Sequence, residues 1–137
     1  MPWVFDPHSG GTKIPQKIQE TIRQRVTQFA AEHYAGKYLR IDVRFRGPYC
    51  YLDAYREPDL SPNWPPPGGP ETREEMLERL RNSPTHLCRL RYFGSLDRWS
   101  CAFFTYSNEK YTPCAYPNGT FFGTLEEGFE IGATYLM

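Results

Sequence analysis

The sequence has no apolar run close to the roughly 18 residues that a membrane-spanning helix requires. Its first residues, MPWVFDPHSGG, also lack the basic start and the apolar stretch of a signal peptide. Charge of neither sign predominates, because 16 lysines and arginines balance 16 aspartates and glutamates. These absences argue against a membrane partner, and we expect the protein to be cytoplasmic.

Motifs of known chemistry are missing as well. The sequence contains neither the G-x-x-x-x-G-K-S/T loop of P-loop proteins nor a G-x-G-x-x-G dinucleotide-binding turn. The three histidines are scattered, and no C-x-x-C spacing occurs among the four cysteines, Cys50, Cys88, Cys101 and Cys114. We therefore expect no cofactor and no metal site, and the absence of recognisable catalytic machinery favours a protein that is not an enzyme.

The sequence does contain enough material for one folded domain. Its 137 residues suit a single core, and 16% of them are aromatic. Residues 1–13 are interrupted by glycine and proline, and we expect them to form an irregular N-terminal arm. From Pro15 to about Gly36, apolar residues recur every three or four positions, which predicts an amphipathic helix.

Alternation with a period of two predicts the strands. Residues 37–46 and 49–55 alternate around Gly47 and Pro48, which indicates a first hairpin. Residues 86–93 and 98–106 indicate a second hairpin. A further strand at about 110–116 leads to an Asn-Gly turn, the dipeptide typical of tight hairpins.

Helices and one long loop complete the chain. Residues 57–70 contain six prolines and two glycines, which predicts a loop of polyproline character. A surface helix is expected from Pro70 to about Asn82, with acidic residues in its first half. Thr124 and Glu127 form a capping-box pattern that predicts a short C-terminal helix, and the four-residue spacing of its two glycines favours close packing on the sheet.

This order of elements predicts an α+β fold. Consecutive hairpins indicate a single antiparallel sheet of about five strands (two or three hairpins), with helices packed on one face. One domain is expected to span residues 1–137. The sequence pattern does not decide the order of the strands in the sheet.

The hairpin registers assign side chains to the two faces of the sheet. Symmetric closure places all four cysteines on the inner face, and the alternation also puts His86 inside and Leu87 outside. Asp42 is expected directly opposite Asp53. The outer face is expected to gather arginines and tyrosines, namely Arg40, Arg44, Arg46, Tyr49, Tyr51, Tyr55, Arg89, Arg91, Arg98 and Tyr106.

The zero net charge therefore conceals a segregation of charge. The segment Lys37–Arg56 holds five cations and two acids, whereas Glu57–Thr85 holds six acids and three cations. Because arginine and tyrosine are enriched at protein interfaces, the first hypothesis is a non-catalytic association module. It would bind a second copy or another protein through the outer face, with Trp64 of the proline-rich loop as a further contact.

Two alternatives use the same face. Arginines that contact phosphates and tyrosines that stack on bases would bind single-stranded nucleic acid. The third hypothesis is a metal-dependent phosphoester hydrolase centred on Asp42 and Asp53. Two carboxylates directly opposite each other repel, so arginines, a shared proton or a divalent cation must relieve the repulsion.

Overall fold

The computed structural model describes residues 10–136, so residues 1–9 of the predicted N-terminal arm, and Met137, lie outside the described residues. The elements follow one another along the chain as α1 (Gln16–His33), β1 (Arg40–Arg46), β2 (Tyr49–Tyr55), α2 (Arg73–Arg81), β3 (Thr85–Ser95), β4 (Arg98–Thr105), β5 (Lys110–Cys114), α3 (Leu125–Gly132) and a 3-10 turn, η1 (Ala133–Leu136).

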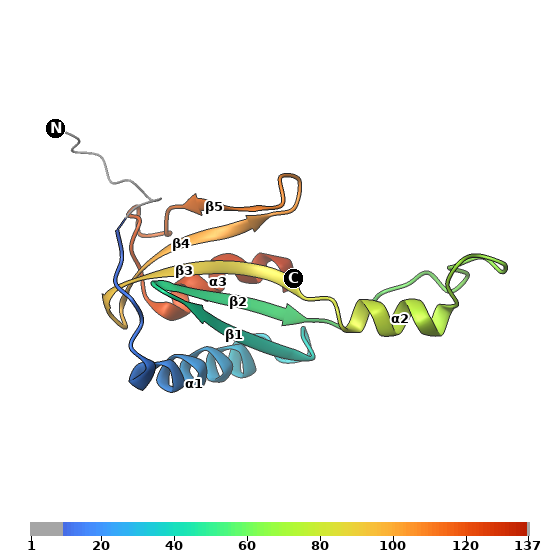
Figure 1. The fold of residues 1–137 in the computed structure, drawn as a ribbon, viewed down its shortest axis with the longest axis horizontal. Coiled ribbons are helices and arrows are strands. Elements are labelled where there is room, and N and C mark those ends of the chain that lie inside the picture. The colour runs from blue at the N-terminus through green and yellow to red at the C-terminus, as the bar shows by residue number, and fades with distance from the viewer. Residues whose placement is uncertain (1–9, 137) are drawn as a thin grey trace.

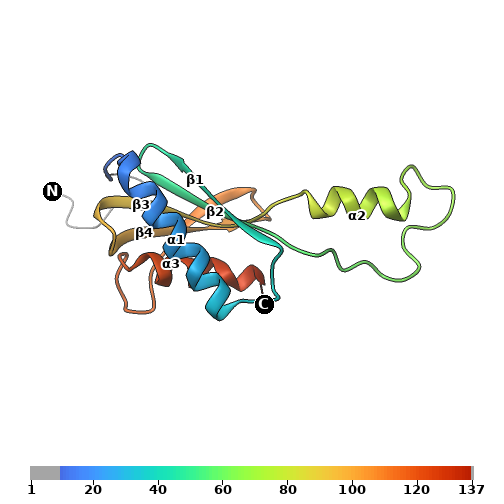
Figure 2. The same ribbon diagram turned by 90° about the horizontal axis from the view of Figure 1, so that it is seen from below.

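The five strands form one open antiparallel sheet. Each strand pairs with its neighbour along the chain, so the order in the sheet is β1-β2-β3-β4-β5. α3 packs against β3 and β4, and α1 packs against β1 and α3. Figures 1 and 2 show both helices on the same side of the sheet. The fold is therefore α+β with helices on one face, as the sequence predicted.

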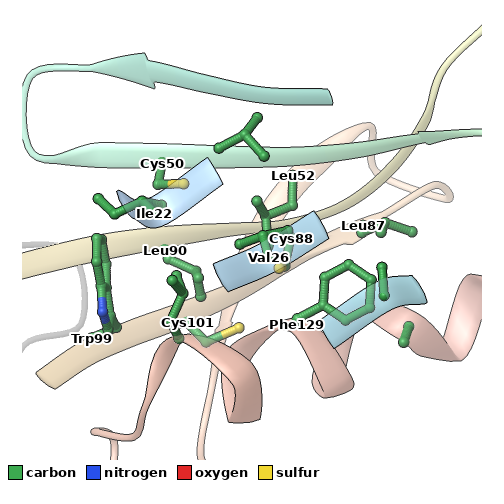
Figure 3. Packing of buried hydrophobic residues seen from close by; sticks show 14 of the residues in the cluster. Ile22, Val26, Cys50, Leu52, Leu87, Cys88, Leu90, Trp99, Cys101 and Phe129 are labelled. Carbon is green, nitrogen blue, oxygen red and sulfur yellow. The ribbon is translucent and has the colours of Figure 1, made fainter. Parts of the chain in front are cut away.

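The core lies between the sheet and these two helices. The apolar stripe of α1, made of Ile22, Val26 and Ala30, is buried. Figure 3 shows Val26 beside Leu52 and Cys88 of the sheet. Each fully buried aliphatic or aromatic side chain of this kind contributes roughly 1.5–3 kcal/mol to folding. Within residues 10–136, no helix is both long and apolar enough to cross a membrane.

α3 lies close on the sheet because it has glycine where larger residues would collide. A Cβ added at Gly132 would stand 2.8 Å from the carbonyl carbon of Leu87, which is too close for any real contact. Thr124 and Glu127 form the predicted capping box, each side chain accepting a hydrogen bond from the other's backbone N–H. The predicted close approach of this helix is confirmed.

The first hairpin has the predicted register throughout, and the second has it from Cys88 to Tyr92, beyond which the register shifts before Ser95 at the turn. Asp42 pairs with Asp53 and Arg44 with Tyr51 across the first hairpin. Leu90 pairs with Cys101 across the second. The thiols lie on the inner face, where those of Cys88 and Cys101 point at the carbonyl oxygen of Gly128 in α3.

The prediction for His86 and Leu87 was wrong. Leu52 pairs with Cys88, but the next residue, Asp53, pairs with His86, so the register shifts between these pairs. The extra residue, Leu87, is fully buried on the inner face beside α3. This β-bulge moves His86 to the outer face, because one inserted residue reverses the alternation of every residue on its far side.

The chain between β2 and β3, residues 57–84, projects from the body; we call this segment the arm (Figures 1 and 2). Its helix α2 begins at Arg73 rather than at the expected Pro70, because the Thr72 hydroxyl accepts a hydrogen bond from Glu75 and caps the helix there. Within the arm, the Arg73 guanidinium donates to the carbonyl oxygens of Ser61 and Trp64. No residue of α2 is buried.

Candidate functional site on the open sheet face

The face of the sheet turned away from α1 and α3 is covered by no described helix, and we call it the open face. Antiparallel sheets commonly present one such face to solvent, with polar side chains on it. Here the side chains are mainly arginine and tyrosine, so the open face is both positively charged and aromatic.

Five residues of the open face stack on one another, and we call them the Arg–Tyr cluster. The Arg44 guanidinium lies 5.0 Å from the ring centre of Tyr51, and that of Arg89 lies 4.4 Å from Tyr49. Tyr111 of β5 reaches across the sheet, where its ring centre is 5.6 Å from that of Tyr51. It passes β4 where Ala102, too small to obstruct it, faces the same side. Cation–π contacts of this kind attract each guanidinium to the face of a ring.

A buried carboxylate lies next to this cluster. Asp53 is 3% exposed, and its Oδ2 accepts a hydrogen bond of 2.9 Å from Nε of Arg44. Its Oδ1 lies 2.8 Å from Nδ1 of His86, whose side chain is 31% exposed. A carboxylate can only accept, so Nδ1 carries the hydrogen, and the lone pair of the neutral ring is on Nε2. Among residues 10–136, none bonds to that nitrogen.

The electrostatics of the site follow from this carboxylate. Partial burial acts to lower the pKa of the Arg44 guanidinium, but the Asp53 carboxylate outweighs it and the pKa is raised. Burial raises the pKa of the Tyr111 hydroxyl, and the Asp53 carboxylate raises it further. Arg44 therefore stays charged and Tyr111 stays a neutral hydrogen-bond donor throughout the physiological range.

The predicted acidic pair is present, and each member has a guanidinium partner. Asp42 accepts a hydrogen bond of 3.2 Å from Arg40, while Asp53 is paired with Arg44. These arginines offset the repulsion between the two carboxylates. Among the described residues, no group of three or more histidines, cysteines, aspartates and glutamates could hold a metal ion.

The remaining predicted residues divide between the rim of the open face and other places. Arg40 stacks on Tyr55 at 4.0 Å, Arg46 is exposed, and Tyr106 packs on Phe104. Arg91 is only 3% exposed, and Gly11 lies against its side chain.

Two predicted residues lie away from the Arg–Tyr cluster. Arg98 stacks on Phe122 near the turn of the β3–β4 hairpin. Trp64 is 53% exposed and belongs to the arm. The structure thus gathers Arg44, Tyr49, Tyr51 and Arg89 of the predicted set in one cluster.

Sequence reasoning missed two residues of this site. His86 was assigned to the inner face because alternation alone does not reveal a bulge. Tyr111 lies on the face opposite Cys114, as its odd spacing from that inner residue implies, but no sequence pattern shows that its ring reaches Tyr51 of β2. The signal that could have found His86 is Leu87 itself, a large apolar residue that strict alternation would leave exposed.

A cleft of about 480 Å³ opens beside the site, where the arm leaves the body. Residues of the arm, such as Leu80, and of the body, such as Arg56, Thr85 and Tyr106, line it. The hydroxyl of Tyr106 accepts a hydrogen bond of 2.7 Å from the backbone N–H of His86. The cleft therefore adjoins the end of the open face that carries the Asp53–His86 pair.

No protein-family model matches the sequence, and searches of curated proteins and of solved structures return no significant match. The site must therefore be interpreted from its own chemistry.

Proposed function

We propose that the open face binds single-stranded nucleic acid. The observation that carries the proposal is the Arg–Tyr cluster, in which Arg44 and Arg89 are stacked on tyrosine rings over an uncovered sheet. Guanidinium groups bind phosphates, and aromatic rings stack on bases at ~1–3 kcal/mol each. A guanidinium already held against a ring loses less conformational freedom when it binds a phosphate.

The charge of the open face supports this proposal. Asp42 and Asp53 lie between the arginines of the open face, and unpaired acids there would repel phosphates. In the fold, Asp53 is buried beneath Arg44 and Asp42 is paired with Arg40. The acids are thereby neutralised, while the exposed guanidinium of Arg44 keeps N–H groups for a phosphate.

Binding should be measured by fluorescence anisotropy with a labelled oligodeoxythymidine of about 12 nucleotides, a length within the site sizes of sheet-based single-strand binders. We expect the affinity to fall steeply between about 50 and 200 mM salt, because bound phosphates release counterions. Arg89→Ala should weaken binding and make the slope of log affinity against log salt shallower by about 0.7. Arg89 is preferable to Arg44, whose removal would also strip a partner from buried Asp53.

Lys17→Ala is the matched control, since Lys17 is an exposed cation of α1 on the covered side of the sheet. It should bind like the unaltered protein. Undetectable binding, binding that ignores salt, or equal losses in both variants would contradict the proposal.

A second candidate, self-association, is favoured by the arm. Its six acids and three arginines oppose in charge the five arginines and two acids of β1–β3 on the open face. An isolated helix as short as the nine residues of α2 is marginal in water, yet no residue of α2 is fully buried. The arm of one copy would lie on the open face of another. Sedimentation velocity should then show a dimer that dissociates at high salt, and a monomer at low salt would exclude it.

A further inference from the structure

The Asp53–His86 pair has a geometry that binding alone does not require. The imidazole is oriented through Nδ1 by a buried carboxylate, whose other oxygen is held by Arg44. Nε2 has no bonding partner among residues 10–136. An imidazole fixed in this way, with one nitrogen free to take a proton, is the arrangement of a general base.

The bulge at Leu87 is what creates this pair. Regular pairing would place His86 among the buried residues under α3, and Asp53 would then face Arg44 alone. Bulges recur beside active sites because they redirect a single side chain. The hydrogen bond from the His86 N–H to the Tyr106 hydroxyl fixes the backbone in the redirected position.

The chemistry around His86 indicates the type of substrate. The described contacts of the ring are to Asp53, Phe104 and Tyr111, so no serine, threonine or cysteine stands at Nε2 as a nucleophile. The nucleophile is then either water or a group of the substrate itself. RNA carries such a group on every nucleotide, the 2′-hydroxyl, next to the phosphate that the arginines would bind.

We propose that the open face cleaves single-stranded RNA, with His86 as general base; this inference rests on the proposed nucleic-acid binding. Nε2 of His86 takes the proton of a 2′-hydroxyl while the 2′-oxygen forms a bond to the adjacent phosphorus. The bond from phosphorus to the 5′-oxygen breaks. The products are a 2′,3′-cyclic phosphate and a 5′-hydroxyl, whose oxygen receives the proton from the imidazolium through solvent.

The other groups have defined parts in this step. Arg44 and Arg89 flank the phosphate and offset the charge that develops on its oxygens. The Tyr51 and Tyr111 rings stack on the bases at either side. Asp53 acts through His86 and is a positioning residue, because it fixes the tautomer and the orientation of the ring.

The test uses three labelled oligonucleotides of equal length with the full chain. One is all-deoxythymidine, one is the same strand with a single uridine ribonucleotide at its centre, and one is all-uridine. We expect all three to bind. The chimera should be cut once, after the ribonucleotide, and mass spectrometry should show the cyclic phosphate. The all-deoxy strand should stay intact because it has no 2′-hydroxyl.

His86→Gln should lower the cleavage rate by about 100-fold or more, with oligonucleotide affinity unchanged within about threefold. His33→Gln, which removes an exposed imidazole from α1, is the matched control and should cut at the normal rate when purified by the same protocol. Circular dichroism should show both variants folded.

The outcomes separate the two proposals. A chimera that binds but stays uncut would overturn the cleavage step and leave the binding proposal in place. Equal cleavage by His86→Gln and the unaltered protein would also overturn it, since the activity would then not depend on this imidazole. Failure of every strand to bind would overturn both proposals.

Discussion

Tyr116, a residue of the core, has a hydroxyl with no hydrogen-bond partner among residues 10–136. Its ring is buried against Gly123 and Gly128. Burial raises the pKa of this hydroxyl, so it stays protonated. A buried hydroxyl without a hydrogen bond costs free energy that an apolar ring of the same shape does not.

Tyr116→Phe should therefore raise the free energy of unfolding by about 1 kcal/mol, measured by urea denaturation. Tyr135→Phe is the matched control, because the Tyr135 hydroxyl donates to the carbonyl oxygen of Phe104. That variant loses a hydrogen bond and should be less stable by a similar amount. A destabilised Tyr116→Phe protein would show that the hydroxyl has a partner after all.

At the scale of elements, the position of α3 depends on its two glycines, Gly128 and Gly132, which have no side chain to collide with the sheet. A Cβ at Gly128 would meet a terminal methyl of Leu90, which can rotate away, whereas a Cβ at Gly132 would meet the backbone of Leu87, which cannot. Both substitutions gain about 1 kcal/mol of helix propensity from alanine. We therefore expect the sheet to accommodate a methyl group at Gly128 more easily than one at Gly132.

We expect Gly132→Ala to destabilise the protein by roughly 1–3 kcal/mol, the usual cost of overpacking, while Gly128→Ala changes stability by less. Thermal unfolding of the two variants, followed by circular dichroism, measures this difference. The opposite order would mean that α3 can shift at its C-terminal end, and that the contact with Leu87 does not fix its distance from the sheet.

The sequence predicted the elements well where its patterns are periodic. Alternation about Gly47 and Pro48 predicted the pairing of Asp42 with Asp53, because a symmetric hairpin leaves no other register. The alternation failed at Leu87 because a bulge leaves no mark in the residue types around it. The bulge nevertheless moves the following residues to the opposite face of the sheet. The carboxylate of the candidate site was thus predictable, but its imidazole partner was not.

Tyr111 illustrates a second kind of failure. Its ring contacts that of Tyr51, three strands away, and this contact depends on how side chains of four strands pack over the sheet, including the small Ala102. No local pattern carries that information. Of the Arg–Tyr cluster, the sequence predicted the members on β1, β2 and β3, where the hairpins fix the faces, and missed the one on β5.

At the scale of the whole molecule, the sheet and the arm are stabilised by separate sets of contacts. The arm is stabilised within itself by exposed ion pairs, such as that between Arg79 and Glu71. The arm's two ends meet at the sheet, where Ala54 of β2 pairs with Thr85 of β3. The sheet therefore does not need the arm to bring its strands together.

A variant in which a short Gly-Ser loop replaces residues 58–83 should consequently fold, with an unfolding transition close to that of the full chain. Because the Arg–Tyr cluster is untouched, its affinity for oligodeoxythymidine should also remain. Sedimentation velocity on the same variant separates the two candidate functions: self-association through the arm predicts that the dimer disappears, whereas nucleic-acid binding predicts no change. Loss of folding would instead mean that the arm supports the sheet, most directly through the cleft it shares with Thr85 and Tyr106.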